Sequence, residues 1–509
     1  MASTVVLTGE DLTLAEVWDV AVGGREAELS DSSRARMRAA RELVDGIHGE
    51  HTYGVNTGFG RFVSEHVPEE QAEELQLRLL RSHACGVGEP YPDEVVRAAM
   101  LLRANALAKG YSGARVETVE LLLACLNRGL LPLVPARGSV GASGDLAPLA
   151  HLALPLVGEG HAFVEGELLD GAEALRRLEL APVRLASKEG LSLVNGTQFM
   201  TAMAALGLVR ARRLAATADL ACALSLEALQ GSRTSFLPAV HRTRPLKGQQ
   251  EAAANVWRLL EGSAIIESHR WCDKVQDAYA LRCAPQVHGA CRDLLDYVEA
   301  TVTVELNAAT DNPLVLLEEG TIVSAGNFHG QPLAFALDAL AMAVAELASI
   351  SERRVERLVN PSLSEGLPPF LVEEGGLNSG FMIPQYVAAS LVSENKVLAH
   401  PASVDSIPTS AGQEDHVSMG NASGLKALRV LANVEHALAI ELLAGTQAIE
   451  FLAPLQPGSG VRAVHDFVRT LSGRLTEDRS LAADIERVAV AIRRGEVVAA
   501  AEREVGVLA

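Results

Sequence analysis

The sequence has few aromatic residues, a deficit of basic residues and no closely paired cysteines. Aromatic side chains make up only 4% of the 509 residues, so the core must come mainly from Ala, Leu and Val within the 48% that are hydrophobic. The formal net charge of −20 argues against nucleic acid as a partner, because phosphate binding needs a basic surface. The six cysteines include no C-x-x-C pair, which argues against a zinc cluster and fits a reducing cytoplasm.

The sequence also lacks the features of a membrane or secreted protein. Residues 1–7 have no basic region followed by a long apolar run, so we predict no signal peptide. Two long apolar stretches are present, from Leu333 to Ile350 and from about Leu425 to Phe451. The first contains two acidic residues, each of which would cost about 2.5 to 3.5 kcal/mol inside a membrane span. We therefore predict helices buried in a soluble bundle or between subunits, with no membrane partner.

Helices dominate the predicted secondary structure after residue 110. Residues 1–110 mix short strand-like runs with polar helices, whereas residues 111–509 are mostly helical, with a probable hairpin from Ala162 to Gly171. Strands and helices do not alternate as in a parallel α/β fold, and there is no dinucleotide fingerprint. We predict a mainly α fold: a smaller mixed α/β region at 1–110, then a bundle of long helices at 111–509.

The stretch from Gly138 to His151 places small residues around Ala142-Ser143-Gly144. A glycine-rich turn or a helix cap is the ordinary interpretation. A nucleophile elbow is excluded because Asp145 stands where glycine is needed, and a phosphate loop is excluded because Gly-Lys-Ser/Thr is missing. A chemical interpretation remains. If a tight turn pressed the Gly144 nitrogen against the Ala142 carbonyl carbon, an imidazolone would form, and loss of the Ser143 hydroxyl would make it an electrophile.

Three more residues stand at positions from which a side chain could reach a substrate. Tyr53 opens a loop with three glycines, which could carry it into a cleft. His83 follows a Leu-rich helical segment, and Asn195 ends an apolar run at an Asn-Gly turn. Taken singly, these residues are more often a packing tyrosine, a structural histidine and a turn residue.

Further candidates lie in the second half of the chain. Gln276, Tyr279 and Arg282 are spaced by three residues, which on a helical turn would place an amide, a phenol and a guanidinium on one face. Phe328 lies in a loop before a long helix, where its ordinary role would be to pack against neighbouring residues. The acids and histidine in Gln413-Glu414-Asp415-His416 suggest metal, but the run is not His-Glu-x-x-His, so we predict none.

Together these motifs resemble the histidine and aromatic amino acid ammonia-lyase family over nearly the whole chain. Members carry Gly-Ser-Val-Gly-Ala-Ser-Gly-Asp-Leu-Ala-Pro-Leu-Ala-His, as residues 138–151 do, and Tyr-Gly-Val-Asn-Thr-Gly-Phe-Gly, as residues 53–60 do. The resemblance implies that Ala142, Ser143 and Gly144 cyclise to 4-methylideneimidazole-5-one (MIO), with no external cofactor. It also implies that long helices from all subunits of a homotetramer pack into one central bundle.

The resemblance implies a role for each candidate. Tyr53 would be the catalytic base, Tyr279 would assist at the prosthetic group, and Arg282 would bind the substrate carboxylate. Asn195 would donate a hydrogen bond to the oxygen of MIO. The other positions around the substrate are Gln276 and Phe328.

The expected substrate follows from His83 and Glu414. Histidine-specific members of the family carry Ser-His, as at Ser82-His83, and Gln-Glu-Asp-His, as at 413–416. A carboxylate suits an imidazole better than a phenyl ring. We therefore expect a cytoplasmic enzyme that eliminates ammonia from L-histidine to give trans-urocanate, the first step of histidine degradation. A tyrosine or phenylalanine ammonia-lyase, an aminomutase of the same family and an inactive helical scaffold remain as alternatives.

Overall fold

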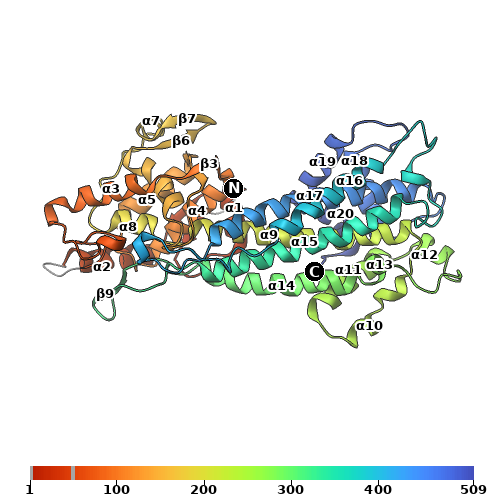
Figure 1. Ribbon diagram of the computed structural model, residues 1–509, viewed down its shortest axis with the longest axis horizontal. Coiled ribbons are helices and arrows are strands. Elements are labelled where there is room, and N and C mark those ends of the chain that lie inside the picture. Colours follow the sequence, from red (N-terminus) through yellow and green to blue (C-terminus); the bar gives the residue numbers. More distant parts are fainter. Residues whose placement is uncertain (1–3, 47–51) are drawn as a thin grey trace. The chain divides into compact units, whose positions relative to one another are not determined.

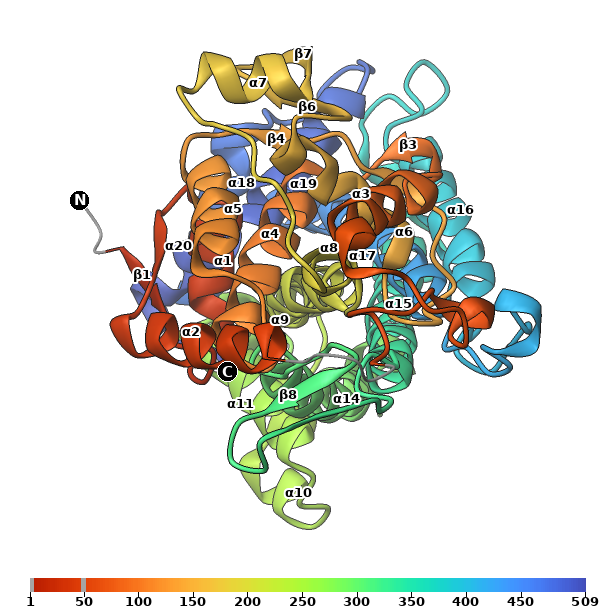
Figure 2. The same cartoon turned by 90° about the vertical axis from the view of Figure 1, so that its left-hand side faces the viewer.

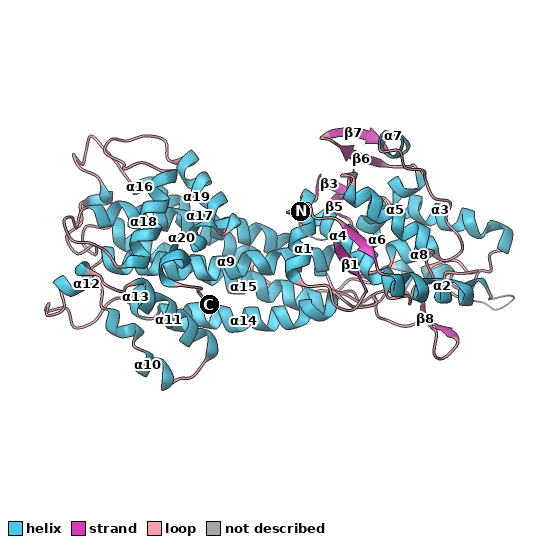
Figure 3. Ribbon diagram, turned by 180° about the vertical axis from the view of Figure 1, so that it is seen from behind, coloured by secondary structure: helices cyan, strands magenta, loops and turns pink. Residues whose placement is uncertain are grey.

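The computed structural model of the chain describes residues 4–46 and 52–509, most of which are helical (Figures 1 and 3). The strands form only small sheets of two or three strands. The predicted mainly α fold is therefore confirmed. Residues 1–3, at the start of the segment in which we predict no signal peptide, lie outside the described residues.

The chain divides into two compact units. Unit 1 comprises Met1–Leu206, Glu299–Asp338 and Pro401–Leu425. Unit 2 comprises Gly207–Val298, Ala339–His400 and Lys426–Ala509. The division of the sequence at residue 110 stays a prediction.

Unit 1 is built around a helix that is buried on almost every side. This helix, α4, packs against α1 and α5, and Figure 2 shows it among the helices of this unit. Most residues of this helix are apolar and few are charged, so little of its surface is suited to face water. The helices of unit 1 are α1 (Leu14–Ala21), α2 (Asp31–Asp45), α3 (Ala72–His83), α4 (Asp93–Ala108), α5 (Val116–Asn127), α6 (Leu146–Ala153), α7 (Gly171–Arg177) and α8 (Glu189–Val194).

All the described strands belong to unit 1. The predicted hairpin is β6 (His161–Val164) paired with β7 (Glu167–Asp170), and its two-residue turn has positive φ at Glu165 (52°) and Gly166 (81°), as a tight hairpin requires. The other pairs are β1 (Val5–Leu7) parallel to β2 (Ala27–Leu29), and antiparallel β3 (Val87–Pro90) with β5 (Pro135–Arg137), β4 (Leu131–Pro132) with β6, and β8 (Leu314–Leu316) with β9 (Thr321–Val323).

Four long helices contribute residues to both units: α9 (Gln198–Ala228), α14 (Ala284–Glu305), α15 (Gln331–Val359) and α17 (Gly420–Glu450). Within unit 2, α15 and α17 are joined by a fully buried ion pair in which Arg354 Nε lies 2.5 Å from Glu441 Oε1. Its partners satisfy each other, as buried charges must. The remaining helices of unit 2 are α10 (Pro238–Arg242), α11 (Lys247–Leu259), α12 (Ala264–Ser268), α13 (Tyr279–Arg282), α16 (Met382–Leu398), α18 (Ser459–Leu471), α19 (Ala482–Arg494) and α20 (Glu496–Val505).

Helix α15 contains the apolar stretch noted between Leu333 and Ile350. By length and composition it is the one helix among the described residues that could cross a membrane, but 72% of its most apolar window is buried. Burial of this kind is what the core helix of a bundle needs. Short 3-10 turns complete the structure at η1 (Gly60–Phe62), η2 (Glu69–Gln71), η3 (Leu154–Val157), η4 (Arg233–Phe236), η5 (Pro369–Leu371) and η6 (Ser410–Gly412).

Candidate active site

The Ala142-Ser143-Gly144 turn lies in unit 1, immediately before α6. Gly144 and Gly196 form a bridge, and the next residue, Asp145, donates its backbone N–H to the Gly196 carbonyl at 2.7 Å. Gly144 has a φ of +76°, and a Cβ there would overlap the Gly196 carbonyl oxygen. Only glycine fits both the backbone conformation and the space, so this part of the turn tolerates no side chain.

Five of the predicted site residues line one cavity of about 780 Å³ in unit 1: Tyr53, His83, Ser143, Asn195 and Glu414. They come from five separate segments of the chain, as far apart as residues 53 and 414. At the centre of this group, the Ser143 hydroxyl donates to Glu414 Oε1 at 3.2 Å. The cavity also has aromatic and apolar walls, which come from Phe59, Phe62, Leu75, Leu79, Leu146 and Leu191.

Glu414 is held by a residue that the sequence analysis missed. The Thr409 hydroxyl donates to Glu414 Oε2 at 2.6 Å, and the Thr409 backbone N–H donates to the Glu414 carbonyl at 2.8 Å. With Oε2 engaged in this way, Oε1 is the oxygen that contacts Ser143. The contact between Thr409 and Glu414 spans the 3-10 turn η6, and no sequence motif marked Thr409 as a partner.

Tyr53 contacts the far end of its own glycine-rich loop. Its phenolic oxygen accepts a hydrogen bond from the Gly60 backbone N–H at 3.4 Å, and its ring packs edge-on against Phe59 with centroids 6.2 Å apart. Burial is the main cause that raises the pKa of Tyr53, and the negative charge of Glu414 adds to it. Within unit 1, the phenol of Tyr53 is therefore held in its neutral, protonated form. It must lose this proton before it can act as a base.

His83 is the last residue of α3. Its Nδ1 lies 2.9 Å from the Leu79 carbonyl, which can only accept, so Nδ1 carries the proton. Burial lowers the pKa of His83, although the Leu79 carbonyl and the charge of Glu414 oppose this effect. The imidazole is therefore neutral at physiological pH, and its Nε2 is a hydrogen-bond acceptor.

Asn195 follows α8 and is almost completely buried. Its side-chain nitrogen donates to the Asn312 carbonyl at 2.9 Å, while its Oδ1 has no partner among the described residues. A buried amide oxygen without a hydrogen-bond partner is costly, so a hydrogen-bond donor at this end of the cavity would satisfy it. Asn195 has a second N–H available for the predicted hydrogen bond.

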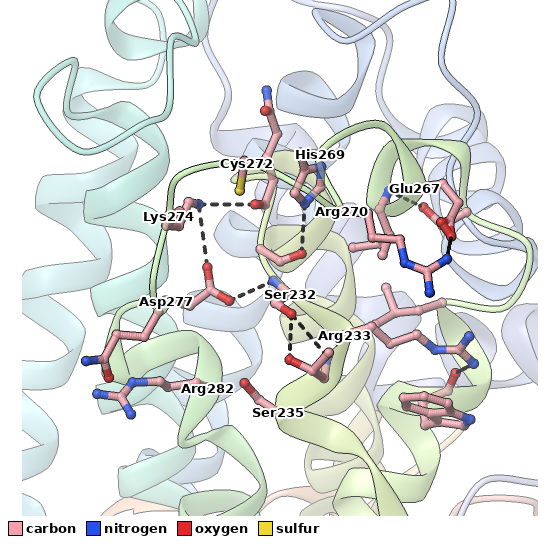
Figure 4. Close-up of a pocket in the computed structure, with 18 of the residues that line it drawn as sticks. Ser232, Arg233, Ser235, Glu267, His269, Arg270, Cys272, Lys274, Asp277 and Arg282 are labelled. Atoms are coloured by element: carbon pink, nitrogen blue, oxygen red, sulfur yellow. Dashed lines mark hydrogen bonds and ion pairs between the residues drawn. The ribbon is translucent and has the colours of Figure 1, made fainter.

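Gln276, Tyr279 and Arg282 lie in unit 2, where Gln276 and Arg282 line a separate cavity of about 900 Å³ (Figure 4). Tyr279 is 71% exposed, and Arg282 Cζ lies 4.6 Å from the centre of its ring. Arg282 Nε is buried without a partner among the described residues. This guanidinium therefore retains capacity for a carboxylate.

The expected common helical face for these three residues is wrong for Gln276. Only Tyr279 and Arg282 belong to the short helix α13, and Gln276 precedes it in a segment without regular structure. At the next residue, the Asp277 carboxylate accepts the Ser232 backbone N–H at 2.6 Å and approaches Lys274 Nζ at 3.5 Å (Figure 4). The helix begins only at Tyr279, because the backbone of Ala278 is extended (φ −62°, ψ 155°).

Phe328 is half-buried in the loop after β9 and is not among the residues that line the unit 1 cavity. The neighbouring His329 stacks on His416 with ring centroids 5.8 Å apart, and its Nε2 lies 3.2 Å from the His416 carbonyl. This loop therefore packs against the segment that carries Glu414. A direct role for Phe328 in the pocket stays a prediction.

Comparisons with known proteins agree over the full chain. A family model described as aromatic amino acid lyase matches residues 12–470. A histidine ammonia-lyase of Gloeobacter violaceus is 55% identical over 99% of this chain and 98% of its own length. The crystal structure of histidine ammonia-lyase from Trypanosoma cruzi has a TM-score of 0.91 at 47% identity, covering 99% of this chain and 96% of that one. The structure of tyrosine aminomutase from Streptomyces globisporus has a TM-score of 0.95 at 39% identity and covers 100% of both chains.

Proposed function

Because the chain belongs to the aromatic amino acid lyase family, we propose that it acts as a histidine ammonia-lyase, eliminating ammonia from L-histidine to give trans-urocanate. Similarity of fold does not select the substrate, since an aminomutase superposes as well as a histidine enzyme does. The observation that carries the proposal is the placement of His83, Ser143 and Glu414 on one cavity, with Ser143 and Glu414 in contact. In this role the protein would perform the first step of histidine degradation.

We infer that Ala142, Ser143 and Gly144 form MIO without an external cofactor. Ring closure joins the Gly144 nitrogen to the Ala142 carbonyl carbon and releases that carbonyl oxygen as water, with the protons of the Ser143 and Gly144 amides. A second water takes the Ser143 hydroxyl and its α-hydrogen. The group supplies an electrophile, which no ordinary side chain offers. The glycine-only geometry at Gly144 supports the fit of such a group, and the second N–H of the buried Asn195 amide could donate to its oxygen.

Substrate recognition rests on two hydrogen-bond acceptors. Neutral His83 gives its Nδ1 proton to Leu79, which leaves Nε2 to accept, and Glu414 offers the carboxylate oxygen that faces Ser143. A neutral imidazole has one N–H donor for such acceptors and an imidazolium has two, whereas a phenyl ring has none. A site built to bind a donor discriminates strongly against a substrate that lacks it, because its buried acceptors are then left unpaired.

The direct test is an assay of the purified protein with L-histidine, L-tyrosine and L-phenylalanine. We expect urocanate and ammonia from histidine, with kcat/KM for phenylalanine lower by about 10²-fold or more. Efficient turnover of tyrosine or phenylalanine instead would identify one of the alternative lyases. Conversion of either acid to a β-amino acid would identify an aminomutase. No turnover of any of the three would favour the inactive scaffold.

Elimination also needs a base for the β-proton, and we assign this role to Tyr53. We expect kcat/KM for histidine to rise with pH through the neutral range, because only the deprotonated phenol accepts a proton and burial raises the pKa of Tyr53. His83, whose pKa is lowered, is already neutral there. A pH profile of kcat/KM from about pH 6 to above pH 10 measures this limb, because the raised pKa of Tyr53 places its bend above the ordinary value of about 10.

The substrate amine also titrates at alkaline pH and could cause the same limb. The pH profile of the Glu414→Gln variant distinguishes titration of Tyr53 from titration of this amine. The charge of Glu414 raises the pKa of Tyr53, so its removal should move the limb to lower pH. The amine of the free substrate titrates identically for both proteins. A limb at the same pH in both proteins would contradict the assignment of this titration to Tyr53.

We propose that Gln276, Tyr279 and Arg282 complete the site in a homotetramer, where they face the unit 1 cavity of another copy. Arg282 would bind the substrate carboxylate and Tyr279 would assist at the prosthetic group. Support for self-association comes from α16, which exposes an apolar face that includes Tyr386 at 61% and Val397 at 72%. Apolar faces of this size are normally covered by a partner, and symmetric association of identical chains is the commonest solution.

Co-expression of two inactive variants tests the shared site. Tyr53→Phe removes the proposed base in unit 1, and Arg282→Ala removes the proposed carboxylate ligand in unit 2. If each site draws these groups from different chains, a random equal mixture restores both groups in about one quarter of the sites. We expect activity to recover to that level in mixed oligomers isolated with two affinity tags.

Two results would contradict the shared site. One is the absence of recovery in mixed oligomers whose composition has been verified. The other is full activity from a species that light scattering shows to be monomeric. Either variant alone is the matched control and should stay inactive or nearly so.

We place the enzyme in the cytoplasm. All six cysteines are free, and Cys125, Cys222 and Cys291 are buried as thiols. Unpaired cysteines of this number fit a reducing compartment better than an oxidising one.

A further inference from the structure

The segment just before α17 contacts the turn that we propose to cyclise. The Met419 backbone N–H donates to the Val140 carbonyl at 2.9 Å, and the Ser418 hydroxyl donates to the Gly141 carbonyl at 3.2 Å. The same hydroxyl accepts the Gly420 backbone N–H at 3.2 Å. Ser418 is completely buried, so its hydroxyl has no competing water and its orientation is fixed by these two partners.

The other end of the turn is also anchored. The Ser139 hydroxyl accepts the Gly141 backbone N–H at 3.1 Å and lies 3.1 Å from Asp145 Oδ1 and 3.3 Å from the Gly144 carbonyl. The Asp145 backbone N–H is bound to the Gly196 carbonyl. The peptide group after Gly144 is therefore held at its nitrogen, with Ser139 beside its oxygen.

The Gly141–Ala142 peptide group is held by Ser418 alone among the side chains that the structure describes. Gly141 has a φ of +68°, and a Cβ there would overlap the Ser418 hydroxyl, so the two residues are in close contact. This peptide group directly precedes the Ala142 carbonyl carbon, which must meet the Gly144 nitrogen. A small rotation of this peptide group would move that carbon, and misplacement by about 1 Å can slow a reaction about 10²-fold.

We propose that Ser418 is a positioning residue for the self-cyclisation: its hydroxyl orients the Gly141–Ala142 peptide so that the Ala142 carbonyl carbon meets the Gly144 nitrogen. The inference rests on the proposed function, because it presupposes that MIO forms. It assigns to the Ser418–Gly420 segment, which follows Glu414 in the chain, a role in orienting the turn for cyclisation. This role is separate from binding the substrate. Ser418 does not line the unit 1 cavity.

The test follows the dehydration by mass rather than by activity. Trypsin cleaves after Arg137 and Arg176, so one peptide from Gly138 to Arg176 contains the whole turn. Its mass is followed over time after a pulse of synthesis, in the wild type, Ser418→Ala and Ser423→Ala. Ser423 is the matched control, since it is an equally buried serine five residues later whose hydroxyl has no partner among the described residues.

We expect loss of both waters at the same rate in the wild type and Ser423→Ala, and a rate about tenfold to 10²-fold lower in Ser418→Ala. Ser418→Ala that folds cooperatively and dehydrates at the wild-type rate would overturn the inference while leaving the proposed function intact. A wild-type peptide that retains both waters would overturn MIO itself and this inference with it.

A second variant covers the case in which Ser418→Ala does not fold. Ser418→Cys keeps a side chain of similar shape but has only a weak S–H donor. Its dehydration should be slower than that of the wild type, and equal rates would overturn the inference. Folding of each variant is checked by circular dichroism on the same samples.

Discussion

Ser143→Ala should reduce turnover of L-histidine by roughly 10³-fold or more, the scale of loss when a principal reacting group is removed. The reason is chemical, because alanine has no hydroxyl to lose and the exocyclic methylidene cannot form. No neighbouring side chain supplies an electrophile in its place. The measurement combines steady-state kinetics with the intact mass of the denatured chain.

The masses make this prediction specific. The wild-type chain should weigh less than its sequence by two waters. The Ser143→Ala chain should weigh less than its own sequence by one water at most, because it has no hydroxyl to lose. Folding should be little affected, since the substitution removes one hydroxyl at the edge of a cavity. An unmodified mass in fully active wild-type protein would refute the mechanism.

Glu414→Gln should lower kcat/KM for histidine by roughly 10² to 10³-fold, with a change in unfolding free energy of less than about 1 kcal/mol. Glutamine has nearly the same shape, and its carbonyl oxygen can still accept the Thr409 hydroxyl that now binds Glu414. What is lost is the negative charge that would accept an imidazole N–H. Kinetics and denaturant unfolding on the same preparation separate the two effects.

Asp405→Asn is the matched control, because Asp405 is an exposed acid in the same segment, Pro401–Leu425, of unit 1. It should leave both kinetics and stability close to wild type. Unchanged histidine turnover in Glu414→Gln, together with tyrosine or phenylalanine activity in the parent, would show that the substrate assignment is wrong.

The sequence was sufficient for features that short segments determine. The mainly α fold, the hairpin at β6–β7 and the apolar helix α15 follow from periodicity, turn residues and composition, which act within a few neighbouring residues. The tripeptide at 142–144 alone is typical of an ordinary turn, and the family resemblance of residues 138–151 supported its chemical interpretation. The roles of the site residues came from the family resemblance and stay predictions.

Contacts between distant segments were beyond the sequence. Ser143 and Glu414 are 271 residues apart, and no periodicity predicts that their oxygens lie 3.2 Å from each other. Thr409 and Ser418 looked like ordinary loop residues, because their importance depends on which atoms they meet. Gln276 was misplaced on a helix because the three-residue spacing carried no information on the extended backbone at Ala278.

The turn at 142–144 is buried and is held by segments that are distant in the sequence, so it takes shape only when unit 1 is assembled. The cyclisation that we propose there would make a covalent mark that later unfolding does not erase. The mass of a denatured chain would then distinguish molecules that once reached the native turn from those that never did. For this protein, a mass spectrum of an aggregated sample would measure how much of it had aggregated after folding.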